Sequence, residues 1–336
     1  MMIHRILPIL ILLLPTLSAS PQDTTRVKGF DFSKLTPIAH FFANAEYNPS
    51  AGVTRDYSLW IGRTHFGFNY EYNSKWSALI LVDRTAVAGS SNSMYLEQAS
   101  LQWQPNDRWT LVGGAIVSNS FIPQERFWNY RFVAETFQDR YYGITSTDLG
   151  FGATYRFSDR LSVDAALTNG EGPKIAQDDL GKIKIAGGIT FAPLKGLMLR
   201  TYFHDKGPGT GGPVHEKMLT LFAGYQNENR WRIGAEYNQV EGYSHFSERV
   251  SYGGSLYGWL TLYKSLRYIA RYDRLWISGV TDNTSIPATD FHALITGLSI
   301  SPVKNITLCL NYQGVFHQDP ETNPVHRVLF SFEYRL

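Results

Sequence analysis

Six charged side chains lie close together in residues 118–146, a stretch that is also dense in aromatic rings. Three of them are basic and are interleaved with three acids: Glu125, Arg126, Arg131, Glu135, Asp139 and Arg140. Charged side chains around a narrow, poorly screened passage act strongly on ions that cross it. These residue types therefore favour electrostatic selection, which needs no nucleophile and no bond-making step.

A second group of residues has the types that bind metals. His204-Asp205 and His215-Glu216 flank the Gly-rich segment KGPGTGGPV, and histidines with carboxylates are zinc ligands. In exposed loops such side chains are far more often simply solvated. The glycines do not stand between a strand and a helix, as a phosphate-binding loop requires. We predict no metal site and no cofactor.

From about Thr36 onward the chain repeats one pattern. A segment of about ten residues with alternating apolar and polar side chains is followed by a short turn, a second segment and a longer polar connection. Period-two alternation indicates a strand with one apolar and one polar face. Seven short turns and eight long connections join sixteen strands. The long connections fall near 48–56, 87–93, 118–146, 171–181, 206–215, 242–250, 278–289 and 318–325.

This repetition predicts an all-β fold, a transmembrane antiparallel β-barrel of about sixteen strands over residues 36–336. The last ten residues, RVLFSFEYRL, carry aromatic side chains on one face up to the final position, as in outer-membrane barrels whose last strand pairs with the first. A soluble two-sheet sandwich is the alternative, but it explains neither this strand nor an export signal. A barrel of sixteen strands encloses an aqueous channel.

The polar faces of the strands carry charges at regular intervals. A charge on the lipid face near mid-membrane costs about 2–4 kcal/mol, so these side chains are predicted to face the lumen. Basic residues slightly outnumber acidic ones, which predicts a weak anion preference; the alternative is that the charges pair and cancel. The predicted lumen charges are Arg63, Asp148, Lys182, Lys184, Arg200, Arg232, Glu236, Arg267, Arg271 and Asp273.

The long third connection, residues 118–146, is predicted to fold into the lumen. Left in water, its rings would form an exposed apolar patch. Pro123 favours a helix start, and Phe127, Tyr130, Ala134 and Phe137 fall at helical spacing. The six charges named above would then line a pore constriction. The alternative is a loop packed on the barrel rim or at a subunit contact.

Residues 125–172 contain three short elements that occur together in one family. They are WNYR at 128–131, STDLG at 146–150 and NGEG at 169–172. The run resembles the phosphate-selective porin O/P-like family of Bacteroidetes-type outer-membrane porins. The resemblance implies a sixteen-stranded porin, a third external loop that forms the constriction, and a homotrimer. Strict selectivity in that family rests on stacked lumen arginines and lysines, whereas here the arginines alternate with acids, which argues against strict phosphate specificity.

The N-terminus has the features of an export signal. His4 and Arg5 precede the apolar run 6–17, which is too short to span a membrane, and small residues follow. We predict a signal peptide over residues 1–20, a mobile segment over 21–35, and location in the outer membrane of a Gram-negative bacterium. An N-terminal anchor helix is the alternative. The net charge of +2 and the absence of a Lys/Arg run exclude nucleic acid as a partner.

These patterns together predict a passive porin. Outer-membrane lipid and small hydrophilic solutes or anions are the expected partners. Barrel enzymes of the outer membrane use a Ser and a His on the outer wall, and His292 and Ser299 share one segment, but no nucleophile motif accompanies them. We therefore predict that the protein is not an enzyme. The alternative function is a closed or narrow barrel that serves as a surface receptor, adhesin or structural protein.

Overall fold

The computed structural model describes residues 31–50, 52, 56–87, 90–174, 183–208, 214–227, 230–278 and 290–336. The chain divides into residues 1–35 and residues 36–336. Within the first unit the described residues form a short 3-10 turn, η2 (Phe32–Lys34), and Leu35 begins the first strand. The predicted signal peptide over 1–20 and most of the segment 21–35 lie outside the described residues, and both stay predictions.

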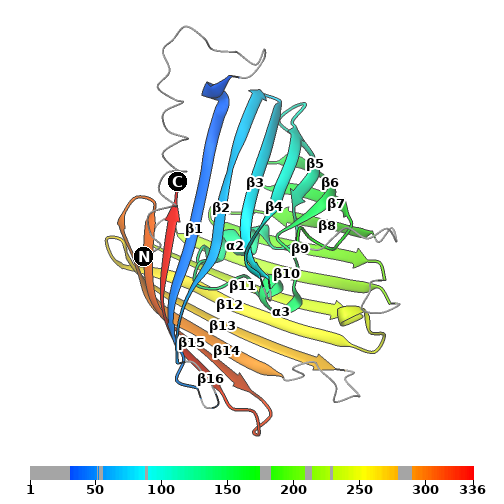
Figure 1. Cartoon of the computed structure of the whole chain (residues 1–336). Helices are drawn as coiled ribbons and strands as arrows, with labels where there is room; N and C mark the ends of the chain where they lie inside the picture. The colour runs from blue at the N-terminus through cyan, green and yellow to red at the C-terminus, as the bar shows by residue number, and fades with distance from the viewer. Residues whose placement is uncertain are drawn as a thin grey trace. The chain divides into compact units, whose positions relative to one another are not determined.

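Within the described residues, sixteen antiparallel strands pair in sequence order and close into a barrel (Figure 1). The predicted all-β barrel of sixteen strands is confirmed. No helix in this described part is long and apolar enough to cross a membrane. The strands are β1 (Leu35–Tyr47), β2 (Tyr57–Asn73), β3 (Trp76–Val87), β4 (Ser90–Trp103), β5 (Trp109–Val117), β6 (Thr147–Ser158), β7 (Leu161–Thr168), β8 (Lys184–Phe191), β9 (Leu197–Lys206), β10 (Glu216–Asn227), β11 (Trp231–Glu241), β12 (Val250–Tyr263), β13 (Leu266–Ser278), β14 (Phe291–Val303), β15 (Ile306–His317) and β16 (Val325–Arg335).

The barrel closes through its first and last strands. β1 pairs with β16 from His40 opposite Arg335 to Tyr47 opposite Val328. Inside the barrel at this seam, the Glu333 carboxylate lies 2.8 Å from the His40 ring and 2.8 Å from the Arg335 guanidinium. The C-terminal aromatic strand therefore has the partner that its alternation predicts.

The two faces of the wall follow the alternation of the sequence. In β11, Ile233 and Tyr237 are exposed on the outside, whereas Glu236 and Asn238 between and after them are buried on the inside. Apolar side chains exposed on the outside suit the hydrocarbon of a membrane. The polar side chains face the lumen.

One irregularity in β4 changes which side chains face inward. The register with β3 shifts between Leu81 and Val82, so that Leu81 pairs with Gln98 and Val82 with Leu96. Such a bulge places two consecutive residues on the same face. Glu97 and Gln98 are accordingly both buried inside the barrel.

The short turns at one end of the barrel carry aromatic side chains. Trp76 and Trp103, from adjacent hairpins, stack with ring centroids 5.4 Å apart. The Asn73 side chain accepts hydrogen bonds from the backbone N–H groups of Lys75 and Trp76, which fixes the first of these turns. This end of the barrel is called the turn end below, and the opposite one the loop end.

Candidate functional site

Loop 3, residues 118–146, connects β5 to β6 and lies inside the ring of strands (Figure 1). It contains two short helices, α2 (Ile122–Trp128) and α3 (Phe137–Tyr142). Asn129 has φ 57°, a left-handed conformation that ends α2. The helix start predicted at Pro123 is confirmed by α2. The helical spacing predicted for Phe127, Tyr130, Ala134 and Phe137 is wrong, because residues 129–136 run as an irregular segment between the two helices.

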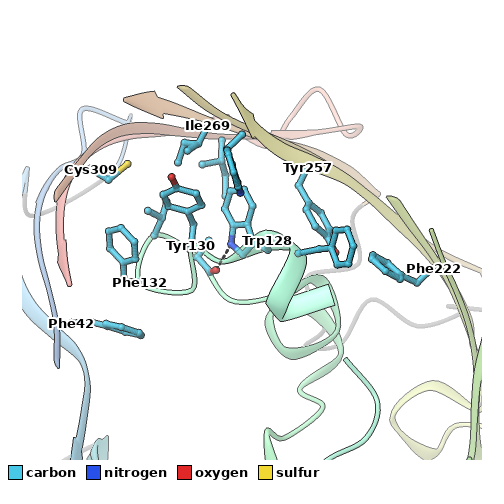
Figure 2. Close-up of a cluster of buried hydrophobic side chains, with 13 residues drawn as sticks. Phe42, Trp128, Tyr130, Phe132, Phe222, Tyr257, Ile269 and Cys309 are labelled. Carbon is cyan, nitrogen blue, oxygen red and sulfur yellow. Dashed lines mark hydrogen bonds between the residues drawn. The ribbon is translucent and has the colours of Figure 1, made fainter. Parts of the chain in front are cut away.

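The rings of loop 3 pack against one half of the inner wall (Figure 2). Trp128 is 0% exposed, and its indole N–H donates to the carbonyl of Ala134 at 2.8 Å. Full burial of a side chain of this size contributes roughly 3 kcal/mol. The wall residues that receive the loop come from β1, β10 and β12–β15: Phe42, Phe222, Tyr257, Trp259, Ile269, Ile295 and Cys309.

Two glycines in the wall make room for the loop. A Cβ atom on Gly224 would lie 2.5 Å from the ring of Phe127, and one on Gly253 would lie 2.3 Å from the ring of Phe137. Both distances are far below contact, so only glycine accepts the rings there. The wall of β10 and β12 is therefore shaped to receive this loop.

A buried ion pair also ties the loop to β13. The Arg271 Nε atom lies 2.8 Å from the Asp273 carboxylate, with both side chains 1% exposed. The same Asp273 accepts a hydrogen bond from the hydroxyl of Tyr141 at 2.8 Å, and Arg271 donates to the carbonyl of Glu135 at 2.5 Å. Loop 3 is thus held by polar contacts as well as by its rings.

The other half of the lumen contains two cavities. The loop-end cavity has a volume of about 290 Å³ and lies between β1–β4 and loop 3. The turn-end cavity has a volume of about 540 Å³ and is bounded by β2–β7 and the first part of loop 3. Its wall combines apolar side chains with neutral polar ones, among them Asn69, Gln98, Ser100, Gln102, Thr110 and Thr154, and with the charged residues Glu71, Arg126 and Asp164.

Charges in the loop-end cavity form networks that sequence reasoning missed. Asp83 lies 3.3 Å from the Arg63 guanidinium and 3.1 Å from the His65 ring. Glu97 lies 3.9 Å from Arg63 and accepts a hydrogen bond from the hydroxyl of Ser146 at 2.6 Å. The inward parity of Asp83 in the segment LILVDRTAV was a usable signal. No comparable signal existed for Glu97, because the bulge shifts its parity.

The structure divides the six predicted constriction charges among different places. Arg131, Glu135 and Asp139 line the loop-end cavity together. Arg131 pairs with Asp139 at 2.5 Å and with Glu125 at 3.1 Å. The other two lie apart. Arg126 lines the turn-end cavity, and the Arg140 guanidinium lies over the Tyr141 ring.

Most of the predicted lumen charges are paired on the inner wall. Lys184 lies 3.2 Å from Asp148, and Arg200 lies 2.5 Å from Asp164. Glu236 is buried and accepts hydrogen bonds from the side-chain amides of Asn238 and Gln138. Lys182 lies outside the described residues. Because most of the charges are paired, only a few basic side chains account for the predicted excess of positive charge.

Three arginines near the turn end form what we call the arginine cluster: Arg126, Arg232 and Arg267. Within the described residues none of the three has a carboxylate within 4.0 Å. Arg232 donates to the backbone carbonyl of Arg126. The guanidinium groups of Arg232 and Arg267 both lie over the Trp259 ring, at 5.4 and 4.2 Å from its centroid. Like charges this close to one ring create a positive potential in the lumen.

Asp148 connects two of the sequence elements noted above. Its carboxylate accepts hydrogen bonds from the hydroxyl of Thr168 and from the backbone N–H of Gly170, both at 2.7 Å, and from the N–H of Gly172. Asp148 thus holds the start of the fourth long connection against β6. The elements STDLG and NGEG are therefore joined by the hydrogen bonds of the Asp148 carboxylate, and we call this contact the Asp148 clamp.

The residues with metal-binding or catalytic side chains do not assemble into a site. His204 lies 3.9 Å from Glu216 inside the barrel, whereas exposed His215 lies 2.6 Å from Asp205. No group of three or more potential metal ligands occurs among the described residues. On β14, His292 is exposed and stacks on Phe316, and buried Ser299 lies inside the barrel. The seven-residue spacing puts them on opposite faces.

Comparisons with known proteins agree with this architecture. No family model and no curated protein matches the chain. Among the solved structures that resemble the chain are three that each cover about 90% of it. They are the outer membrane channel DcaP of Acinetobacter baumannii (14% identity, TM-score 0.68, 97% of that chain covered), an anion-selective porin from Comamonas acidovorans (12%, 0.68, 99%) and OmpT of Vibrio cholerae in a trimer form (11%, 0.60, 99%).

The chain has the porin fold. Sequence identities this low establish the fold alone. The identity of the solute has to come from the side chains that line the lumen. In this barrel, loop 3 is seated on β10–β15 and the charged loop-end cavity lies beside it.

Loop 3 gives this porin fold a carboxyl that responds to mild acid. Burial raises the pKa of Asp139 above its ordinary value, more than the neighbouring Arg131 lowers it. As the pH falls, Asp139 takes up a proton before ordinary carboxyls do. Arg131 then loses one of its two counter-charges, and the loop-end cavity becomes more positive. We expect anion selectivity, measured as the reversal potential under a salt gradient, to increase as the pH falls.

The Asp139→Asn variant is the control for this pH dependence. It should show the acid-state selectivity already at neutral pH and little further change on acidification. Glu321→Gln, which removes an exposed carboxylate on the β15–β16 connection, should keep the normal profile. Identical pH profiles for Asp139→Asn and the unmodified chain would rule out Asp139 as the titrating group.

Proposed function

We propose that this protein is a channel of the Gram-negative outer membrane for the passive diffusion of small hydrophilic solutes and ions. The observation that carries the proposal is the half-filled lumen. Loop 3 occupies the side of β10–β15 with apolar packing, and the side of β2–β7 retains two cavities lined by polar side chains. A barrel used only as a surface scaffold has no need for a polar, hollow half.

The proposed route follows the wall of β2, β3 and β4 from the loop end to the turn end. Along β3, Asp83 faces the loop-end cavity and Ser77 and Leu79 face the turn-end cavity. A solute would thus meet a densely charged region first and then a region with fewer charges, where Glu71, Arg126 and Asp164 stand among neutral side chains. Neither region holds an assembled metal site among the described residues, and selection in the proposed channel rests on size and charge.

A weak anion preference is the second part of the proposal, and the arginine cluster supports it. Elsewhere on the described inner wall the charges are largely paired, whereas Arg126, Arg232 and Arg267 are not paired with carboxylates. Arg126 also lines the turn-end cavity. Arg126 therefore places a positive charge on the route itself, whereas Arg232 on β11 and Arg267 on β13 lie outside both cavities and act on anions through their potential in the lumen.

The test is conductance of the refolded chain in a planar bilayer, with the reversal potential measured under a salt gradient. We expect stepwise openings and a modest anion selectivity. The Arg232→Gln/Arg267→Gln double variant should lose most of that selectivity while it still opens. Arg230→Gln, which removes an exposed charge at the neighbouring short turn, is the matched control and should behave as the unmodified chain.

Two outcomes would contradict these proposals separately. A barrel that inserts but stays closed would favour the receptor, adhesin or structural role and remove the channel proposal. A conducting barrel whose selectivity is unaffected by the Arg232/Arg267 substitutions would keep the channel and remove the arginine cluster as the source of the preference.

We propose further that the protein belongs with the phosphate-selective porin O/P-like family and assembles as a homotrimer. The Asp148 clamp supports the family assignment, because it gives a structural reason for STDLG and NGEG to occur together. The trimer form of OmpT supports the oligomer only by likeness of fold. Native mass measurement in mild detergent tests it, and a stable monomer would contradict it.

A further inference from the structure

The loop-end cavity has a charge pattern that the proposed channel function does not use. Eight charged side chains line it, four basic and four acidic, so that its net charge is zero. The basic residues are Arg63, Arg84, Arg131 and Lys174, and the acidic residues are Asp83, Glu97, Glu135 and Asp139. Four aromatic rings, Phe42, Trp60, Tyr95 and Phe132, line the same cavity.

Most of these charges are engaged with one another. Arg63 contacts Asp83 and Glu97, and Arg131 contacts Asp139. Arg84 also has an interaction partner. Groups held in such pairs have little attraction left for a solute, because each is already neutralised at close range.

Two exposed groups of opposite sign remain. Within the described residues, Glu135 on loop 3 has no basic side chain within 4.0 Å of its carboxylate, and Lys174 has no carboxylate within 4.0 Å of its ammonium group. The Lys174 Nζ atom instead lies 5.4 Å from the centroid of the Tyr95 ring. The two groups come from different segments and face one cavity.

A solute with a single charge is poorly suited to this arrangement. An anion attracted by Lys174 meets the carboxylate of Glu135, and a cation attracted by Glu135 meets the ammonium group of Lys174. A solute that carries both an ammonium and a carboxylate group satisfies both at once. A volume of about 290 Å³ is at the lower limit of ligand pockets and admits only small molecules of this kind.

We propose that the loop-end cavity is a binding subsite for zwitterionic solutes, namely amino acids and short peptides with both termini free. Glu135 receives the ammonium group, Lys174 receives the carboxylate, and the rings of Tyr95, Trp60 and Phe132 contact the apolar part. The proposal rests on the channel function, because the cavity is the entrance of the proposed route.

The test compares four probes on the unmodified chain in a planar bilayer, through the block of ionic current. The probes are L-alanyl-L-alanine, its N-acetyl form without the ammonium group, its C-terminal amide without the carboxylate, and glucose as a neutral hydroxylated solute. We expect the free dipeptide to bind about fivefold more tightly than either blocked form, the upper range for one exposed ion pair. Glucose should bind weakest.

Two variants test which side chain of the cavity binds which charged group of the dipeptide. Glu135→Gln should bind the free dipeptide no better than its N-acetyl form, and Lys174→Gln no better than its amide. Glu321→Gln and Lys217→Gln, both exposed and outside the cavity, are matched controls and should keep the full preference. Equal binding of the free and blocked dipeptides to the unmodified chain would overturn the proposal, and so would preferential block by glucose.

Failure of the channel function is distinguishable from failure of the subsite. If the barrel does not conduct, calorimetric titration of the detergent-solubilised chain with L-alanyl-L-alanine tests the cavity without any current. Heat of binding that depends on Glu135 and Lys174 would keep the subsite on a closed barrel. The absence of binding heat would overturn it.

Discussion

Replacing residues 121–142 of loop 3 with a short Gly-Ser linker should raise the single-channel conductance roughly twofold or more, because an unobstructed sixteen-stranded barrel encloses a wide aqueous lumen. The removed segment contains both helices and the rings that fill the side of β10–β15. Ser118 and Ser146, whose backbones are hydrogen-bonded to each other at the root of the loop, are retained. Stepwise conductance in a planar bilayer is the measurement.

The matched control replaces residues 319–323, in the connection between β15 and β16, with a linker of the same composition. That connection lies outside both cavities, so its replacement should leave conductance unchanged. If the loop 3 replacement also conducted as the unmodified chain does, loop 3 would not limit the channel, and the alternative of a loop that packs without narrowing the lumen would stand.

Removal of the Asp273 side chain by Asp273→Ala should lower the free energy of unfolding by about 3–5 kcal/mol, the usual cost of leaving one member of a buried ion pair alone. Arg271 would remain 2% exposed without its carboxylate partner, and the hydroxyls of Tyr141 and Ser255 would lose their acceptor. Urea-driven unfolding in lipid vesicles, followed by tryptophan fluorescence, measures the change. Current noise should also increase, because loop 3 loses an anchor.

The double variant Arg271→Met/Asp273→Leu separates charge from packing. Apolar replacements of similar volume are often neutral or stabilising at such sites, so the double variant should recover most of the stability that Asp273→Ala loses. Glu321→Gln, which changes an exposed carboxylate, should leave stability unchanged. A double variant as unstable as Asp273→Ala would show that hydrogen bonding to loop 3, and not the isolated charge of Arg271, dominates.

Much of the barrel was predictable because a period-two pattern is a local property of the sequence. The alternation around Ile233 and Glu236, and the aromatic face of β16, define strands and their faces without knowledge of any partner. The positions of His292 and Ser299 differ by seven, an odd number. The sequence alone therefore predicts that the two side chains lie on opposite faces of the strand. The entry of loop 3 into the lumen followed from the density of its rings.

The candidate site was less predictable because it depends on pairings between distant strands. Which wall residues receive Trp128 is set by the register and closure of the barrel, and the sequence around residue 128 carries no information on Tyr257 or Ile269. The bulge that turns Glu97 inward is likewise a property of the β3–β4 pair. The irregular segment after Asn129 replaced the predicted helix because ring packing on the wall outweighed helical spacing.

The pairing of β1 with β16 also determines the order in which this chain folds. Almost the whole sequence separates His40 from Arg335, so the seam is the contact with the largest loop-closure entropy and forms late. Until it forms, the sheet has two open edges, each able to template pairing with another chain. At this seam β1 has no partner until β16 has been synthesised. Until the seam closes, a chain of this topology is therefore exposed to pairing and aggregation with its neighbours.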